Sequence, residues 1–426
     1  MIKTTQELSH YLAMTTEKSG YSLARSRLNV VDDWAYRDRV LKHNTGGFFN
    51  VCGMKTSEEK EYLVLFQPQS ALTGLVFCRV EDEILILLQA RVEPGNIHIG
   101  QYGPTIQSTM ANYMQLHGGR PTSYLDYFFG FTPSCTVHST SLQLDLGKRY
   151  FQKSKHHMLL EVEDMFPVKS PMAWVSLSAL SESMEADYFL NTDLRSLLAL
   201  YDWQKYQSGK TEVIDNYGSE GALSDLITHH LMQQKTTLSS HRLVSLDGLE
   251  GWSRSEEGVV SNDKRAPYIH FYRSQCQSRE KDSWIQPLMG VAGVGLVQLY
   301  MRTGAHQPEY LIVSGKEFGV SEEAVLHPSR LYYAEEMVDF FDPDEEFLDK
   351  MKPYGGEGKR VLRAFYQSDE GGRFYQMRSL YQLIEVDETY QKASNEFWIS
   401  RAELKKLLLT NNMNSIQLRC IATLLD

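Results

Sequence analysis

The chain has 426 residues, of which 42% are hydrophobic and 23% charged, and its formal net charge is −11. This composition is typical of a globular protein, and the length allows two or three domains. The acidic balance argues against a nucleic-acid partner, whose phosphates usually require a basic face. No apolar run approaches the length that crosses a bilayer, and the first residues lack the apolar core of a signal peptide. We therefore expect a cytoplasmic protein that does not contact membranes.

In chain order, the first predicted element is an amphipathic helix over Thr4–Lys18, which we interpret as a lid or packing arm. Strand-type apolar runs follow at Glu61–Gln67, Thr73–Val80, Ile84–Val92 and Met158–Val162. Helical periodicity then predicts helices at Trp174–Met184 and Leu194–Tyr201, and a further helix at Leu223–Gln234 inside a segment that is polar at both ends.

The second half of the chain repeats the first at a fixed separation, which is the distance along the sequence from Glu93 to Glu317 and is called the repeat offset below. The same offset, without a gap, pairs Gly95 with Gly319, Pro104 with Pro328, Gln143 with Gln367, Asp145 with Asp369, Arg149 with Arg373, Trp174 with Trp398 and Arg195 with Arg419. The predicted strands and helices recur at Ser283–Gln286, Gly295–Arg302, Glu309–Val313, Leu383–Val386 and Trp398–Leu409. Upstream the separation drifts slightly, so that Trp34 corresponds to Trp252.

This repetition predicts a helical arm over residues 1–20, repeat one over 21–203, a linker over 204–240 and repeat two over 241–426. Strands and terminal helices occur without regular β-α alternation, which favours an α+β fold over a doubly wound parallel sheet.

The most polar segment of repeat one, Arg91–Gly119, opens where a predicted strand runs into a Pro-Gly turn. Polar side chains there alternate with Ile97, Ile99, Ile106 and Met110, which a free surface loop would not need. Buried polar groups are costly unless they are satisfied, so the segment is either a solvated loop or a ligand pocket. The interleaved apolar residues favour the pocket.

Several strings in the chain resemble the NDP-hexose 2,3-dehydratase family of deoxysugar biosynthesis. They are H-N-T-G-G-F-F-N-V-x-G from His43, E-P-G-N from Glu93, G-P-T-I-Q-S-T-x-x-N-Y from Gly103, H-G-G from His117, Y-L-D-Y-F from Tyr124 and Q-S-D-E-G-G-R-F-Y from Gln367. The resemblance implies two tandem Nudix-like α+β repeats, a homodimer, a thymidine-diphosphate 4-keto-6-deoxyhexose as substrate, and coupling to a 3-ketoreductase. The Nudix signature is absent from both halves, so pyrophosphate hydrolysis is not expected.

The implied reaction needs no redox cofactor. The ketone at carbon 4 acidifies the hydrogen on carbon 3, and the hydroxyl on carbon 2 stands β to that ketone. Proton removal, loss of hydroxide and tautomerisation give a 3,4-diketo-2,6-dideoxy sugar. The site must supply a general base, a donor to the enolate oxygen and an acid for the departing hydroxide.

We predict His117, Tyr113 and Glu93 as catalytic residues. His117 titrates nearest neutrality and precedes two glycines that let the backbone approach a ligand, although it could equally be a turn residue. Tyr113 could donate to the enolate oxygen or act as the base, or its hydroxyl could simply be satisfied. Glu93 recurs as Glu317 in the half that lost the surrounding motif, which favours a structural role.

Substrate contacts are predicted for a larger set of residues with donors, cations or close backbone. They are Arg27, Trp34, Asn96, Gln101, Thr105, Gln107, Thr109, Asn112, Gly118, Gly119, Tyr124, Arg149 and Lys153. Arg149 would hold the diphosphate or, since it recurs, form an internal ion pair. No metal site is predicted, because the five cysteines are scattered and His156 and His157 would point apart on a strand.

The chain departs from the family pattern in both halves. Repeat two reads E-F-G, P-S and E-M where repeat one has E-P-G, P-T and N-Y, so we predict a degenerate second site. Repeat one lacks an arginine that the family tends to carry before Met158, and Lys148, Lys153 or Lys155 could replace it. The alternative function is a nucleotide-sugar-binding or scaffolding protein that has lost catalysis.

Overall fold

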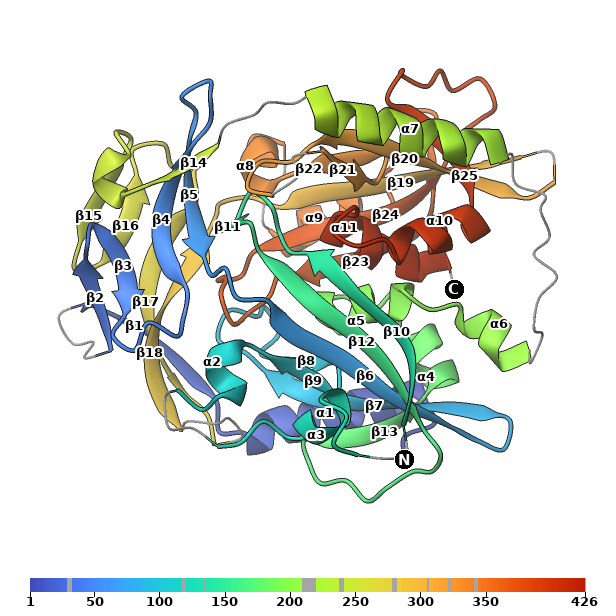
Figure 1. Ribbon diagram of the computed structural model, residues 1–426, viewed down its shortest axis with the longest axis horizontal. Coiled ribbons are helices and arrows are strands. Elements are labelled where there is room, and N and C mark those ends of the chain that lie inside the picture. The colour runs from blue at the N-terminus through green and yellow to red at the C-terminus, as the bar shows by residue number, and fades with distance from the viewer. Residues whose placement is uncertain are drawn as a thin grey trace.

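The computed structural model describes residues 1–28, 33–116, 120–132, 135–208, 220–236, 241–277, 282–304, 306–320, 324–340 and 344–425. Strands group into four sheets over these residues, and helices pack on their faces, which confirms the predicted α+β class. Figure 1 shows the two larger sheets at the right, one above the other, and the two smaller sheets together at the left. No helix in these ranges is long and apolar enough to span a membrane.

The large sheet of repeat one has the strand order β10-β12-β6-β7-β13, with β8 pairing β7 and β9 pairing β6. These strands are β6 (Ala71–Val80), β7 (Glu83–Val92), β8 (Gly100–Gly103), β9 (Ile106–Ser108), β10 (Cys135–Leu144), β12 (Ser154–Val162) and β13 (Met172–Ser176). The helices of this half are α1 (Thr5–Lys18), α2 (Met110–Tyr113), α3 (Leu125–Phe128), α4 (Leu177–Glu182), α5 (Thr192–Ala199) and α6 (Trp203–Ser208). The predicted N-terminal helix is confirmed, and it buries Leu8 and Leu12 against this sheet.

The large sheet of repeat two has the equivalent order β21-β20-β19-β24-β23, with β22 pairing β19 and β25 pairing β20. Its strands are β19 (Gly295–Thr303), β20 (Pro308–Lys316), β21 (Ala324–His327), β22 (Arg330–Tyr332), β23 (Arg360–Ser368), β24 (Arg378–Glu385) and β25 (Glu396–Ser400). Its helices are α7 (Glu220–Thr236), α8 (Ala334–Met337), α9 (Glu345–Met351), α10 (Arg401–Leu408), α11 (Ile416–Ala422) and the 3-10 turn η3 (Thr423–Leu425).

The strand registers of the two large sheets confirm the predicted repeat. Trp174 lies opposite Leu87 in repeat one, and Trp398 lies opposite Leu311 in repeat two, so both members of the pair are shifted by the repeat offset. Even an irregularity recurs, because the β10–β12 ladder slips between Val137 and Ser139 and the β23–β24 ladder slips at the equivalent place.

The two small sheets exchange strands between the repeats. One contains β2 (Trp34–Arg37), β3 (Val40–His43), β4 (Asn50–Lys55), β5 (Glu61–Phe66), β11 (Tyr150–Phe151) and β14 (Arg242–Val244); the other contains β1 (Ser22–Ser26), β15 (Trp252–Ser255), β16 (Gly258–Ser261), β17 (Tyr268–Gln275) and β18 (Ser283–Gly290). Strand β1 pairs with β17 of repeat two, and β14 pairs with β4 of repeat one. A boundary drawn along the sequence therefore does not separate these sheets.

The predicted helix at Trp174–Met184 is wrong at its start, because residues 172–176 form strand β13. All five side chains of that strand are buried, and a short apolar run of this kind does not distinguish a strand from a helix by periodicity alone. Helix α4 begins only after Ser176, whose side chain accepts a hydrogen bond from the Ala179 amide. The same correction applies to Trp398–Leu409, where Ser400 caps α10.

Two fully buried arginines join the repeats. Arg195 on α5 donates from Nε to Oε1 of Gln367 at 2.8 Å, and Arg419 on α11 donates from Nη1 to Oε1 of Gln143 at 3.3 Å. Burial lowers the pKa of each guanidinium to about 10, so both stay charged near neutrality. The two arginines correspond to each other at the repeat offset, as do the two glutamines, and they fix α5 and α11 each against the other repeat.

Thr105 and its counterpart Ser329 each form hydrogen bonds to the backbone of two neighbouring strands. The Thr105 hydroxyl accepts from the Val76 amide at 2.9 Å and donates to the Leu87 carbonyl at 2.6 Å. The Ser329 hydroxyl accepts from the Tyr300 amide and donates to the Leu311 carbonyl, both at 2.7 Å. The change from threonine to serine therefore keeps the hydroxyl and its two backbone partners.

Candidate active site

The two motif loops of the chain meet across the repeats. The Gly95 amide in E-P-G-N donates to the Gly371 carbonyl at 2.8 Å, and the Gln376 amide donates to the Gly95 carbonyl at 2.7 Å. A Cβ added to Gly95 would lie 1.5 Å from the Phe374 carbonyl oxygen, so no larger residue fits there. The loop that carries D-E-G-G-R in repeat two is thereby fixed beside the polar segment of repeat one.

A narrow cleft opens beside this contact. Most of its walls come from the ends of strands and the starts of helices in repeat one. The remaining wall is the loop between β23 and β24 of repeat two. The lining residues are Gln67, Ala71, Arg91, Glu93, Gln107, Ser108, Thr109, Asn112, Tyr150, Lys153, Lys155, Asp193, Glu370, Gly372 and Arg373.

Lys155 is the centre of a buried charge cluster in the wall of this cleft. Its Nζ lies 2.8 Å from Asp193 Oδ1, 3.1 Å from Glu370 Oε2 and 3.2 Å from Asp145 Oδ2. Burial by itself would lower the pKa of Lys155, but the three carboxylates together raise it well above its ordinary value. Burial raises the pKa of Asp193, whereas the Lys155 and Arg373 cations overcome burial and lower that of Glu370. Lys155 is thus a fixed cation that joins both repeats.

Three further cations surround the cleft. Arg91 Nε contacts Glu93 Oε1 at 2.6 Å, which neutralises that carboxylate. Arg373 lies over the ring of Phe49 at 4.8 Å and donates from Nη1 to the Gly372 carbonyl. Lys153 donates to the Gln69 carbonyl at 2.6 Å. The buried hydroxyl of Thr109 has no hydrogen-bond partner among the described residues, so it is available to donate to a ligand in the cleft.

Five of the predicted site residues line the cleft: Glu93, Gln107, Thr109, Asn112 and Lys153. Asn96 and Gln101 instead support the motif loops, because Asn96 donates to the Ile99 carbonyl and Gln101 to the Tyr188 carbonyl. His117, Gly118 and Gly119 lie outside the described residues, so their roles stay predictions.

The other predicted residues have different partners. The Tyr113 ring packs edge-on against Phe129, and Tyr124 packs among Tyr127 and Phe166. Trp34 is buried against His43 and Phe49, and Arg27 forms a surface ion pair with Glu257. None of these four is among the residues that line the cleft over the described ranges.

The sequence-based prediction missed Arg91, Asp193, Glu370 and Arg373 as site residues, and it named Lys155 only as a possible replacement for the missing arginine. The repeat nevertheless carried a signal for several residues of the cleft. At the repeat offset, Arg91, Lys153, Lys155 and Asp193 correspond to Gly315, Met377, Ser379 and Gln417. Charge that occurs in only one of two otherwise equivalent repeats is not required by the fold. The internal comparison therefore points to these four residues, whereas it does not mark Arg373, which recurs as Arg149.

The equivalent region of repeat two is filled by residues of repeat one. Arg149 forms a two-pronged ion pair with Glu335, with Nη1–Oε1 at 3.0 Å and Nη2–Oε2 at 2.5 Å. Lys148 pairs with Glu336, and the Tyr333 hydroxyl donates to Glu317 Oε1 at 2.7 Å. Arg149 therefore takes the internal ion-pair role that its recurrence favoured, and Lys148 does not face the cleft of repeat one.

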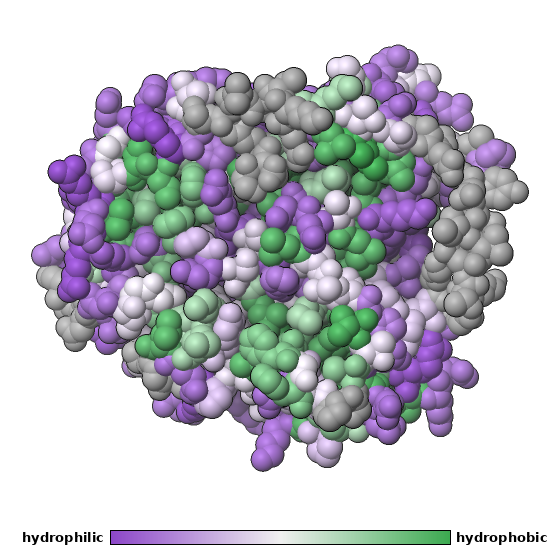
Figure 2. Space-filling view, in the orientation of Figure 1, coloured by the Kyte–Doolittle hydropathy of each residue, from purple (hydrophilic) through white to green (hydrophobic). Residues whose placement is uncertain are grey.

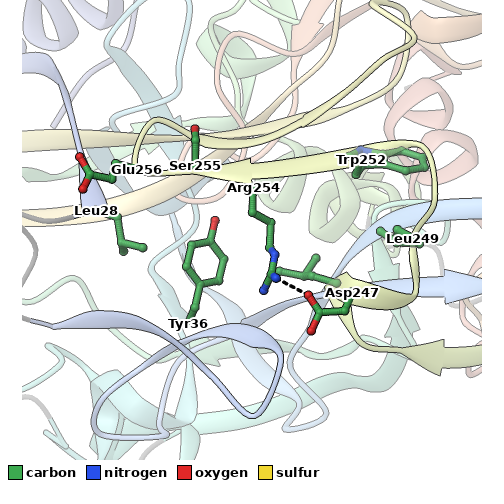
Figure 3. Close-up of a pocket in the computed structure, with 9 residues that line it drawn as sticks. Leu28, Tyr36, Asp247, Leu249, Trp252, Arg254, Ser255 and Glu256 are labelled. Carbon is green, nitrogen blue, oxygen red and sulfur yellow. Dashed lines mark ion pairs between the residues drawn. The ribbon is translucent and has the colours of Figure 1, made fainter.

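A second, wider cavity lies where the small sheets meet, between β2, the 3-10 turn η2 (Leu246–Gly248) and β15 (Figure 3). Tyr36 and Trp252 form part of its wall, and Arg254 both pairs with Asp247 and lies over the Tyr36 ring. Its charged groups already satisfy each other, and it holds none of the motif residues of repeat one. We therefore place the chemistry in the cleft around Lys155.

A cleft that holds several cations, an unpaired hydroxyl and close backbone is suited to a phosphorylated ligand. Comparison with known proteins identifies the family of the chain. A sequence profile described as NDP-hexose 2,3-dehydratase matches residues 5–201 and 223–425, and the chain belongs to this family. The matched ranges include every residue that lines the cleft.

Individual relatives support the same assignment. The chain is 24% identical to a dTDP-4-dehydro-6-deoxy-alpha-D-glucopyranose 2,3-dehydratase of Amycolatopsis orientalis over 98% of this chain and 89% of that protein. It is 25% identical to the enzyme of the same name from Streptomyces violaceoruber over 95% and 94%. Among solved structures, it is similar to the Nudix hydrolase RenU of M. smegmatis (TM-score 0.19, 11% identity, 30% of this chain and 83% of that one) and to the Ap4A hydrolase of C. elegans (TM-score 0.18, 12% identity, 28% and 87%).

The ion pair that fills repeat two gives a stability prediction. Arg149→Met leaves Glu335 largely buried without its partner, so the free energy of unfolding is expected to fall by about 3–5 kcal/mol. The double variant Arg149→Met with Glu335→Leu should recover most of this loss. Denaturant titration followed by circular dichroism measures both, with Arg360→Met at the exposed Arg360–Glu385 pair as the control that should cost less than about 1 kcal/mol. An Arg149→Met protein as stable as that control would show that the pair does not hold the repeats together.

Proposed function

We propose that this protein removes water across carbons 2 and 3 of a thymidine-diphosphate 4-keto-6-deoxyhexose, as a hydro-lyase that forms a 3,4-diketo-2,6-dideoxy sugar nucleotide. The observation that carries the proposal is the cleft itself, where cations that occur only in repeat one meet the D-E-G-G-R loop of repeat two. The names of the relatives supply the substrate class.

The charges of the cleft suit a diphosphate next to a neutral sugar. Lys155 lies among three carboxylates and Arg91 is matched by Glu93, so both cations are already compensated and this wall carries a net negative charge. Arg373 has no carboxylate within ion-pair distance among the described residues, and it lies at the repeat-two wall. It is therefore the cation best placed to hold the diphosphate, with the Thr109 hydroxyl as an additional donor.

The reaction is redox-neutral overall, because the electron pair of the broken carbon–oxygen bond leaves with the hydroxide, and carbon 2 is reduced to the same extent as carbon 3 is oxidised. The protein must position the sugar, remove the proton on carbon 3, stabilise the enolate and protonate the leaving hydroxide. Asn112 and Gln107 line the cleft at positions that can hydrogen-bond sugar hydroxyls, and Asn191 holds the Gln107 side chain at 2.8 Å. His117 stays a predicted acid or base.

The exposed apolar surface near the cleft supports the proposed homodimer. Figure 2 shows apolar side chains gathered on the face that carries α2 and α3. Met110, Met114, Phe129 and Phe131 are 41%, 58%, 48% and 75% exposed, which is costly for a surface that stays in water. We expect light scattering after size exclusion to give the mass of two chains. A mass of one chain, unchanged in Phe131→Asp, would contradict this interface.

The proposed reaction is tested with the 4-keto-6-deoxy sugar nucleotide in deuterated water, without added nicotinamide cofactor. Mass spectrometry should show loss of one water together with one deuterium at carbon 2, which takes up a hydron from solvent when the enol becomes the diketone. With a 3-ketoreductase and its cofactor present, the labile diketone should be trapped as a 2,6-dideoxy product. Tight binding of the nucleotide sugar with unchanged substrate in both reactions would instead support a binding or scaffolding protein.

A further inference from the structure

Lys153 is the unusual cation of the cleft. It is 4% exposed, and its Nζ donates to the Gln69 carbonyl at 2.6 Å. No carboxylate lies within ion-pair distance of this Nζ over the part of the chain that the structure describes, whereas Lys155, two residues away, contacts three. A backbone carbonyl can accept a hydrogen bond from either a charged or a neutral amine, so this contact does not require the charge.

Burial without a counter-charge favours the neutral amine. Desolvation lowers the pKa of Lys153 to about 8, and the nearby cations Arg373 and Lys155 act in the same direction against the carboxylates of Asp145 and Glu370. A lysine of this kind is rare in structural positions, because an unpaired buried ammonium destabilises the fold. Buried lysines with lowered pKa values are suited to proton transfer near neutral pH.

The fold does not require a lysine at this position. The counterpart of Lys153 in repeat two is Met377, and the residues before them, Gln152 and Gln376, have the same left-handed backbone with φ of 51° and 50°. The backbone is therefore the same in both repeats, while the amine occurs only in the half that has the cleft. A methionine of similar length fills the same place without charge.

We propose that Lys153 is the general base that removes the proton from carbon 3 of the substrate, an inference that rests on the proposed function. The neutral amine takes the proton, and the carbon–hydrogen electron pair forms the enolate of the 4-ketone. The enolate then expels the hydroxyl of carbon 2, and the Lys153 ammonium gives it the proton so that it leaves as water. The resulting enol becomes the 3,4-diketone, and the amine is again neutral.

The first test is Lys153→Met, which introduces the side chain of repeat two. Turnover is expected to fall by about a hundredfold or more, the usual scale for a positioned base. Exchange of the carbon 3 hydrogen with deuterated water should fall in parallel, because the same proton transfer limits both. Unchanged turnover in this variant would overturn the proposal and leave the proposed function intact, whereas a wild-type protein that never eliminates water would overturn the function itself.

Lys153→Arg distinguishes a base from a simple counter-ion. Arginine keeps the positive charge but cannot be deprotonated near neutral pH, so a base role predicts that this variant is as inactive as Lys153→Met. A role in holding the diphosphate predicts that arginine restores activity, which would contradict the proposal. Lys153→Cys alkylated with bromoethylamine rebuilds an amine at this position, and we expect it to recover activity.

The pH dependence of the wild-type protein provides a test that needs no variant. If the neutral amine is the active form, kcat/KM should rise with pH and level off above about 8, because this ratio reports the free enzyme. The groups that face Lys153 are Lys155, Arg373, Asp145 and Glu370. The pKa of Lys155 is raised by its carboxylates and that of Glu370 is lowered by the neighbouring cations, so neither of these two groups changes its charge across this range. A flat profile from pH 6.5 to 9.5 would contradict the assignment even if both variants failed to fold.

Discussion

The backbone contact between Gly95 and the loop at Gly371 is the constraint on which the site depends. Two hydrogen bonds and a glycine without room for a Cβ hold the D-E-G-G-R loop of repeat two against the E-P-G-N turn of repeat one. That contact places Glu370 on Lys155 and Arg373 beside the cleft. Repeat two is therefore part of the site as well as the scaffold, and neither half could form the cleft alone.

The same backbone contact occurs in both repeats, but it lies beside an open cleft in repeat one and beside a filled region in repeat two. In the second copy of this contact the Gln152 amide donates to the Gly319 carbonyl, as the Gln376 amide does to Gly95. There the equivalent space is closed by Arg149 with Glu335 and by Tyr333 with Glu317. Burial raises the pKa of Glu317 to about 7, so this region is also poorly suited to hold a fixed negative charge. Among the described residues, these side chains occupy the place in repeat two that the cleft takes in repeat one.

The sequence was sufficient to predict the α+β class, the repeat and its register, because these depend on periodicity and on a gap-free correspondence. It was not sufficient to tell Asn96 and Gln101, which support loops, from Gln107 and Asn112, which face the cleft. All four are polar residues in one motif, and their direction is set by strands that pair far along the chain. Glu370 and Arg373 were missed for the same reason, because the sequence of their motif in repeat two does not show that this loop packs beside the cleft of repeat one. Trp174 was predicted to lie in a helix because both faces of its strand are buried, so the sequence lacks the alternation of polar and apolar residues that marks a strand.

The central claim is that one nucleotide-binding cleft is built by both repeats. Calorimetric titration with thymidine diphosphate tests it most directly, using wild-type protein and Arg373→Gln, with Arg360→Gln as a matched control on the exposed surface of the same repeat. We predict one site per chain and a dissociation constant about ten- to a hundredfold weaker in Arg373→Gln, the usual effect of losing one charge-assisted contact. The control should bind as the wild type does. Two equivalent sites per chain, or unchanged affinity in Arg373→Gln, would contradict the account.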